Sequence, residues 1–165
     1  MKKKTILSAF MMLFVALNMV MSQEKDSVVS LPEIRITSMA SINEKVANSF
    51  NKKFPEATDL KWFKYDQGYL AKFIQKDMDH NALFRKSGFM VYDIGYGYEK
   101  HIPSDIYKLV TDLYDNYKVI RSINIKTGGR DIWVVKLEGL KKYTTVRIED
   151  MELDEVERFD KSDID

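Results

Sequence analysis

The fold is decided by the stretch of residues 41–75, which reads SINEKVANSFNKKFPEATDLKWFKYDQGYLAKFIQ. Ser41 and Glu44 have the spacing of a capping box, in which a serine hydroxyl and a glutamate carboxylate satisfy free backbone donors at a helix start. Apolar residues then recur every four positions as far as Phe54, which gives the helix one apolar stripe. Pro55 ends the helix, because the residue before a proline avoids helical backbone angles.

Strand patterns follow this helix. Four strands are predicted in two hairpins, at 60–65, 69–75, 82–86 and 89–94. A second helix is predicted from Pro103 and Ser104 onward, and it is followed by strands at about 119–126, 131–138, 143–149 and 151–159. Hairpin-connected strands after each helix predict an α+β fold, with an antiparallel sheet and both helices on one of its faces.

The sequence also repeats itself. Six residues return 63 positions later, so that Ser41, Val46, Phe50, Phe54, Leu60 and Trp62 match Ser104, Leu109, Leu113, Tyr117, Ile123 and Ile125. Residues 69–73 match 133–137 with an offset of 64 (133 − 69), and the extra residue is assigned to the turn at 127–130. A duplicated unit of one helix and its strands is therefore predicted, which defines the architecture and leaves the activity open.

The first 22 residues have the pattern of a secretory signal peptide. Lys2 to Lys4 form a basic start, residues 6–20 are mostly apolar, and Val20 and Ser22 are small residues that suit a cleavage site. A retained membrane anchor is the alternative. Cleavage would place the protein in the periplasm or outside the cell, with no membrane span left, and residues 23–40 would form a flexible N-terminal segment.

The amino-acid composition excludes several kinds of functional site. The chain has no cysteine, which excludes disulfides, thiol catalysis and thiolate metal sites. Without residues 1–22 the chain carries 23 basic residues (26 − 3) and 25 acidic ones, a net charge of −2 that argues against nucleic-acid binding. Nine of the acids fall within residues 149–165, which predicts either a solvated end or an electrostatic cover for a basic surface.

Several of these features carry a resemblance to a known family. They are the sequence Phe54-Pro55-Glu56-Ala57, the strand residue Trp62, the strand 69–73, the turn at 87–88 and the stretch 102–106. Residues 41–160 resemble the PepSY-like, beta-lactamase-inhibitor-like (BLIP-like) periplasmic proteins of Bacteroidetes. The resemblance implies two tandem repeats of one helix and four strands, at 41–100 and 101–165, joined into one curved sheet. It also implies binding or inhibition of a protein partner through the open sheet face.

Catalytic and metal-binding patterns are nearly absent. His80 and His101 are the only side chains suited to act as a base at neutral pH, and both fall in predicted loops without a nucleophile motif nearby. Residues 77–81 have part of the spacing of a calcium loop, but Ala82 and Gly88 stand where that loop needs glycine and glutamate. We therefore predict no catalytic residues, no metal site and no cofactor, and a polar hairpin turn at 77–81.

The remaining candidate is a surface of the sheet, because alternate strand residues point to opposite faces. One phase is expected to face the helices: Leu60, Trp62, Tyr69, Ala71, Phe73, Ile123, Ile125, Trp133, Val135 and Leu137. The other phase combines cations with apolar groups, and we predict from it the binding residues Lys61, Phe63, Tyr65, Lys72, Ile74, Arg85, Lys126, Lys136 and Arg147. An ordinary solvated sheet face is the alternative.

These patterns favour an exported binding module rather than an enzyme. Its predicted partner is an acidic protein or an anionic ligand of the cell envelope, held on the sheet face opposite the helices. Two alternatives stay open: a structural envelope protein, and a small hydrolase that uses one of the histidines.

Overall fold

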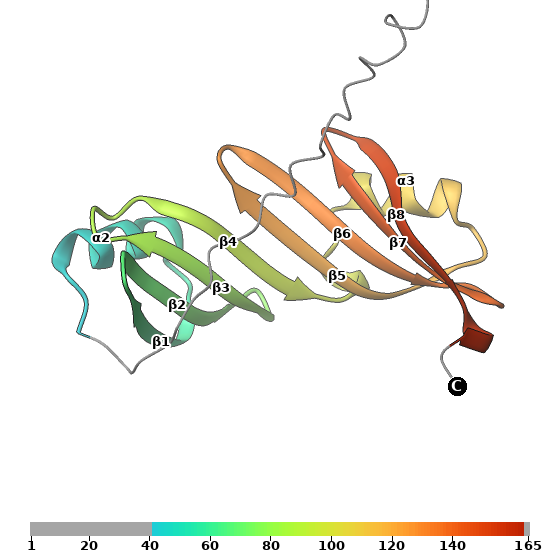
Figure 1. The fold of residues 1–165 in the computed structure, drawn as a ribbon. Coiled ribbons are helices and arrows are strands. Elements are labelled where there is room, and N and C mark those ends of the chain that lie inside the picture. Colours follow the sequence, from blue (N-terminus) through green and yellow to red (C-terminus); the bar gives the residue numbers. More distant parts are fainter. Residues whose placement is uncertain (1–40, 164–165) are drawn as a thin grey trace, which may run out of the picture. The chain divides into compact units, whose positions relative to one another are not determined.

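The computed structural model describes residues 41–163 (Figure 1). The predicted signal peptide (1–22) and the predicted flexible segment (23–40) lie outside the described residues. No helix among the described residues is long and apolar enough to cross a bilayer.

The described chain folds as one helix and four strands, followed by the same order again. The first set is α2 (Glu44–Lys53), β1 (Thr58–Tyr65), β2 (Gly68–Gln75), β3 (Met78–Arg85) and β4 (Met90–Gly97). A 3-10 turn, η2 (Glu99–His101), leads to the second set, which is α3 (Ser104–Leu113), β5 (Lys118–Thr127), β6 (Arg130–Glu138), β7 (Lys142–Glu149) and β8 (Glu152–Asp160), with a final 3-10 turn η3 (Lys161–Asp163). The eight strands form one antiparallel sheet in chain order, which confirms the α+β class (Figure 1).

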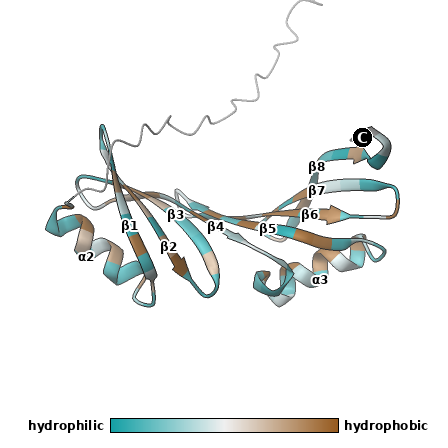
Figure 2. Ribbon diagram, turned by 90° about the horizontal axis from the view of Figure 1, so that it is seen from below, coloured by the Kyte–Doolittle hydropathy of each residue, from teal (hydrophilic) through white to brown (hydrophobic). Residues whose placement is uncertain are grey.

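Each helix is held by an apolar cluster on the sheet. Val46 and Phe50 of α2 are buried against side chains of β2 and β3, and the Phe50 ring lies 5.0 Å from the Phe73 ring and 5.2 Å from the Trp62 ring. Val110 of α3 is buried against β5, β6 and β7, in a cluster that contains Trp133. Figure 2 shows α2 next to β1 and β2, and α3 next to β5 and β6. Ten-residue helices are marginal alone, so this packing stabilises them.

The predicted start of the first helix is wrong by two residues. Asn43, rather than Ser41, caps α2, because its side-chain oxygen accepts a hydrogen bond from the backbone N–H of Val46 at 3.0 Å. The Asn43 amide also donates to the backbone oxygen of Lys86 at 2.9 Å, which ties the helix start to the β3–β4 turn. The asparagine side chain divides the two roles between its atoms, because its oxygen accepts and its amide nitrogen donates.

The 63-residue offset between the two halves is also wrong. The helices begin 60 residues apart (104 − 44), and so do β1 and β5 (118 − 58). The C-caps Phe54 and Tyr114 are also 60 apart, with φ −130° and ψ 61° at the first and φ −130° and ψ 53° at the second. Leu113, which the 63-residue offset matched to buried Phe50, is 61% exposed.

The turns explain where the offset changes. Both first hairpins close with two-residue turns, since Tyr65 pairs with Gly68 and Thr127 pairs with Arg130. No extra residue therefore lies in the turn at 127–130. The difference lies in the strands, because β5 has ten residues and β1 has eight.

This correction reverses the faces of β5. The observed offset is 60 between β1 and β5 (118 − 58) and 62 between β2 and β6 (130 − 68). Both numbers are even, whereas 63 is odd, and a shift by one residue moves every side chain of a strand to the other face. Asn124 pairs with Trp133 and so lies on the helix-covered face, together with Lys126. Ile123 and Ile125, predicted to face the helices, lie on the opposite face.

Candidate functional site

The open face is the side of the sheet away from α2 and α3, and it holds eight of the nine predicted binding residues. The register aligns Lys61 with Lys72 and Phe63 with Leu70, and it carries this face from β1 across to β8. The eight are Lys61, Phe63, Tyr65, Lys72, Ile74, Arg85, Lys136 and Arg147. Lys126 is the exception, because it pairs with Asp93 across β4 and β5 on the helix-covered face.

A second apolar cluster lies on the open face of the first four strands. Leu83 is fully buried, and Leu70 and Tyr92 are each 5% exposed. Half-buried side chains pack against these three, among them Phe63, Tyr65 and Ile94. We call these six residues the open-face cluster. Our sequence analysis missed Leu83 and Tyr92, although the uninterrupted apolar run 82–84 is the pattern of a strand buried on both faces.

Basic side chains border the open-face cluster. The Lys72 ammonium lies 5.5 Å from the centre of the Phe63 ring, and the Arg85 guanidinium lies 5.5 Å from the Phe89 ring. Burial raises the pKa of Tyr65, while the Arg85 charge acts in the opposite direction. Burial and the neighbouring Tyr96 and Tyr65 raise the pKa of Tyr92, so both phenols stay neutral at physiological pH.

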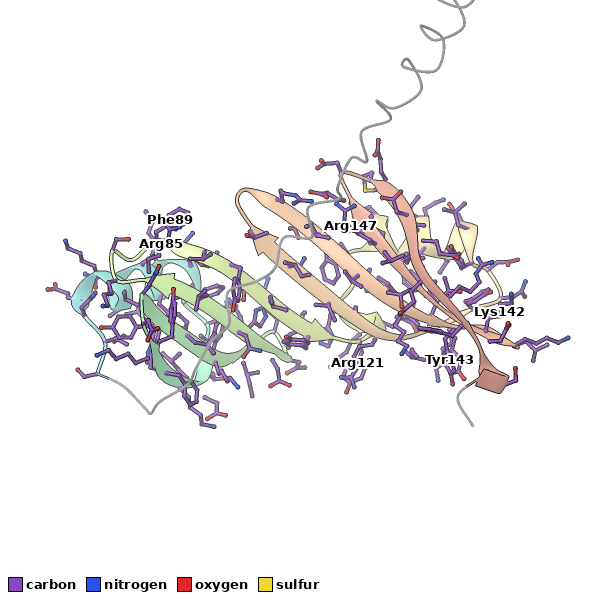
Figure 3. All side chains as sticks on the ribbon, viewed as in Figure 1. Arg85, Phe89, Arg121, Lys142, Tyr143 and Arg147 are labelled. Atoms are coloured by element: carbon purple, nitrogen blue, oxygen red, sulfur yellow. The ribbon has the colours of Figure 1, made fainter. Side chains whose placement is uncertain are left out.

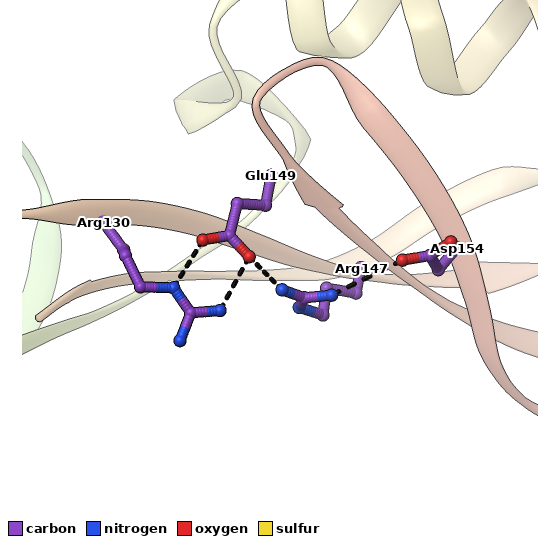
Figure 4. Close-up of polar contacts among 4 residues, drawn as sticks. All are labelled: Arg130, Arg147, Glu149 and Asp154. Carbon is purple, nitrogen blue, oxygen red and sulfur yellow. Dashed lines mark hydrogen bonds and ion pairs between the residues drawn. The ribbon is translucent and has the colours of Figure 1, made fainter.

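The open face of the second half has a different charge balance. Arg130 donates two hydrogen bonds to Glu149, from Nε at 2.5 Å and from Nη2 at 2.7 Å (Figure 4). Arg147 contacts Glu149 and also donates to Asp154 at 3.4 Å. The hydrogen bond from Arg130 is the main reason that the pKa of Glu149 is lowered. Arg147, a predicted binding residue, is thus neutralised within the fold.

The acidic end of the chain supplies this neutralisation. Residues 152–160 form β8, which pairs with β7, and Asp154 stands directly across from Arg147. The acidic segment is therefore an edge strand whose carboxylates partly cover the basic groups of the open face. Figure 3 shows Arg85 and Phe89 together near α2, and Arg147 over the strands of the second half. In the first half, Lys61 is also paired, since its ammonium lies 3.1 Å from the Asp59 carboxylate.

Both histidines lie in regular structure rather than in loops. His80 is in β3, and its Nδ1 lies 3.0 Å from a carboxylate oxygen of Asp93 in β4. His101 is in η2. The predicted turn at 77–81 is confined to Lys76 and Asp77, which both have positive φ, and Met78 begins β3. Across residues 41–163 there is no group of three or more His, Asp or Glu side chains arranged to hold a metal ion.

The comparisons with known proteins show the fold. No protein-family model matches the sequence, and no curated protein matches it. Among crystal structures, the chain is similar to a BLIP-like protein from Bacteroides fragilis, with 14% identity, a TM-score of 0.55 and coverage of 74% of this chain and 88% of that one. The predicted resemblance to the BLIP-like proteins is therefore confirmed as a shared fold.

Two further crystal structures have the same fold. A DUF2874 family protein from Bacteroides ovatus is 18% identical, with a TM-score of 0.53, and the match covers 75% of this chain and 91% of that one. A protein from Bacteroides eggerthii that is described as periplasmic is 12% identical, with a TM-score of 0.51, and the match covers 73% and 90%.

Proposed function

We propose that this protein is an exported, non-catalytic binding module that holds a protein partner on the open face of its first four strands. The observation that carries this proposal is the open-face cluster, which combines buried Leu83 with half-exposed Phe63 and Tyr65 on a sheet face that no helix within residues 41–163 covers. Aromatic side chains over a buried apolar base are the usual centre of a protein–protein interface.

The charges around the cluster indicate the kind of partner. Lys72 and Arg85 lie at its border, and exposed Ile74 extends the apolar surface along β2. A partner with an apolar patch ringed by carboxylates would complement this surface, and its approach would be accelerated by the charges. The acidic groups of the second half would keep that partner on the first half.

The fold and the sequence support the rest of the proposal. The BLIP-like fold and the fold shared with a protein described as periplasmic agree with the signal-peptide pattern of residues 1–22. We also propose that the recurring order of one helix and four strands reflects tandem PepSY-like repeats, 41–100 and 101–165. The 60-residue spacing of the helices and of their C-caps supports this origin.

The structural alternative has less support. Assembly through sheet edges would use β1 and β8, because these are the outer strands of the sheet. Every side chain of β8 except Leu153 is exposed, and the strand carries the acids Glu152, Asp154 and Glu155. Like charges on an edge strand oppose pairing with a second copy.

Affinity capture from envelope extract tests the proposal. The protein is expressed from the full chain, purified after export and immobilised as wild type, as Lys72→Glu and as Lys64→Glu. Lys64 is the matched control, since it lies on the same pair of strands but on the helix-covered face. We expect a discrete protein to be retained at low salt, lost with Lys72→Glu and kept with Lys64→Glu. Equal retention by all three would exclude the open face as the site.

A further inference from the structure

The helix-covered face contains a cavity of about 460 Å³ in the region between the two helices. Its walls come from the end of α2, from β2 to β6 and from η2, so both halves of the chain contribute. Beside the cavity, β4 carries Gly95 and Gly97 on this face. A Cβ at Gly95 would lie 2.9 Å from His80 Cε1, and a Cβ at Gly97 would lie 2.8 Å from His101 Nδ1. Glycine at these two positions lets the histidine rings lie over the strand.

Two polar side chains are fixed in the cavity wall. The side chains of His80 and Asp93 are 11% and 4% exposed, and the carboxylate lies 3.0 and 3.2 Å from Nδ1. Asp93 can only accept when ionised, so Nδ1 of His80 is the donor. The stacked Phe73 ring, 5.1 Å from the His80 ring, fixes the plane of the imidazole. The pair forms a rigid wall of the cavity.

His101 has an unused hydrogen-bonding group. Its Nδ1 accepts the backbone N–H of Tyr98 at 2.9 Å, so the proton of the neutral ring is on Nε2. Nε2 is buried and, within the described part of the chain, has no hydrogen-bond partner. An unpaired buried donor costs about 1–3 kcal/mol, and this nitrogen is enclosed by the fold rather than open to the cavity.

The charge of the cavity is positive. Lys53, Lys76 and Lys126 line it, and Asp93 is the acid in its lining. Asp93 is already engaged by His80, and Asp131 outside the lining lies 3.8 Å from the Lys126 ammonium. The remaining lining is partly apolar and includes Phe54, Met78 and Trp133.

We propose that this cavity binds a small organic anion with a flat apolar body. The carboxylate would lie among the three lysines, and the apolar body would lie against Phe54 and Trp133. This activity is separate from the proposed partner binding, because the cavity lies on the opposite face of the sheet.

The test uses 2-naphthoate as the probe and its neutral isostere 2-naphthalenemethanol as the control ligand. Nitrogen-15 NMR spectra of the full exported protein are recorded during titration. We expect saturable shifts of the Gly95 and Gly97 amides and of the His101 ring with naphthoate, and roughly tenfold weaker binding of the alcohol. Absence of saturable shifts at these residues, or equal affinity for the two ligands, would overturn the proposal.

A pair of charge reversals then locates the anion. Lys126→Glu is expected to weaken naphthoate binding roughly tenfold, whereas Lys136→Glu, on the open face ten residues further along the same hairpin, is expected to change it less than about twofold. Equal effects of the two reversals would contradict the placement. If Lys126→Glu does not fold, the comparison of the two ligands on the wild type still decides. Partner capture is tested with Lys72→Glu and Lys64→Glu, whereas anion binding is tested with Lys126→Glu and Lys136→Glu, so the two proposals can fail independently.

Discussion

At the scale of single residues, the β7–β8 turn stores backbone strain. Asp150 and Met151 have φ of 50° and 63°, in the left-handed region that is unfavourable for residues with a Cβ. We expect Met151→Gly to raise the free energy of unfolding by about 0.5–1 kcal/mol, because the relief of strain exceeds the added flexibility of the unfolded chain. Urea unfolding followed by circular dichroism measures this.

The β5–β6 turn provides the matched control. Gly129 has φ of 83°, and an added Cβ would contact nothing within 4 Å. Gly129→Ala should therefore lower the free energy of unfolding by about 0.5–1 kcal/mol for conformational reasons alone. Changes of the same sign in the two turns would show that φ does not control their stability.

Glu149 makes stability depend on pH. Its pKa is lowered in the folded protein, chiefly by the hydrogen bond from Arg130. The contribution is therefore fully present above the ordinary glutamate value of about 4.3, and it is lost as the pH falls through the lower folded value. We expect the wild type to lose more stability than Glu149→Gln between about pH 5 and pH 2.

Denaturant unfolding at several pH values measures this difference. Glu152→Gln is the control, because Glu152 stands directly across the hairpin from Glu149. It should leave the pH dependence close to that of the wild type. Parallel curves for the wild type and Glu149→Gln would contradict a stabilising role for the ion pairs of Figure 4.

At the scale of elements, α2 depends on one aromatic residue. Phe50 is 2% exposed and contacts the rings of Phe54, Trp62, Phe73 and Phe84. Phe50→Ala should cost about 3–5 kcal/mol, because it leaves a cavity beneath the helix. Leu113→Ala in α3 should change stability by less than about 0.5 kcal/mol, since Leu113 is 61% exposed. Thermal and urea unfolding of both variants give the two values.

This comparison separates the two alignments of the halves. The 63-residue offset makes Phe50 and Leu113 equivalent, whereas the observed 60-residue spacing makes Val110 the equivalent of Phe50. Similar losses of stability for Phe50→Ala and Leu113→Ala would support the rejected offset.

The elements could be predicted from the sequence better than their faces. Strand bounds follow from local alternation and turn residues, so each predicted strand lies within four residues of its observed start. The face of β5 depends on a count across the whole unit, and an error of one residue placed Ile123 and Ile125 toward the helices. The position of His80 in β3 was missed because the polar stretch 77–81 resembles a turn. The hydrogen-bond partner that a buried histidine needs is Asp93, which is thirteen residues away in the sequence.

At the scale of the whole described unit, the sheet separates two kinds of surface. The open face carries the apolar cluster beneath Phe63 and Tyr65, and the helix-covered face carries the basic cavity around His101. The alternation of strand residues predicted most of the first surface. The second surface could not be predicted from the sequence. Its lining residues come from the end of α2, from β4 and from β5, and only the folded structure brings these elements close together.

The most direct test of the central claim is the affinity of the captured partner for Phe63→Ala. Phe63 is a half-buried member of the open-face cluster. Its replacement by alanine should weaken partner binding at least about thirtyfold, as expected for a hot-spot residue. Leu113→Ala, on an exposed apolar residue of α3, should leave the affinity within about twofold. If Phe63→Ala binds as tightly as the wild type while its fold is retained, the open face is not the partner site.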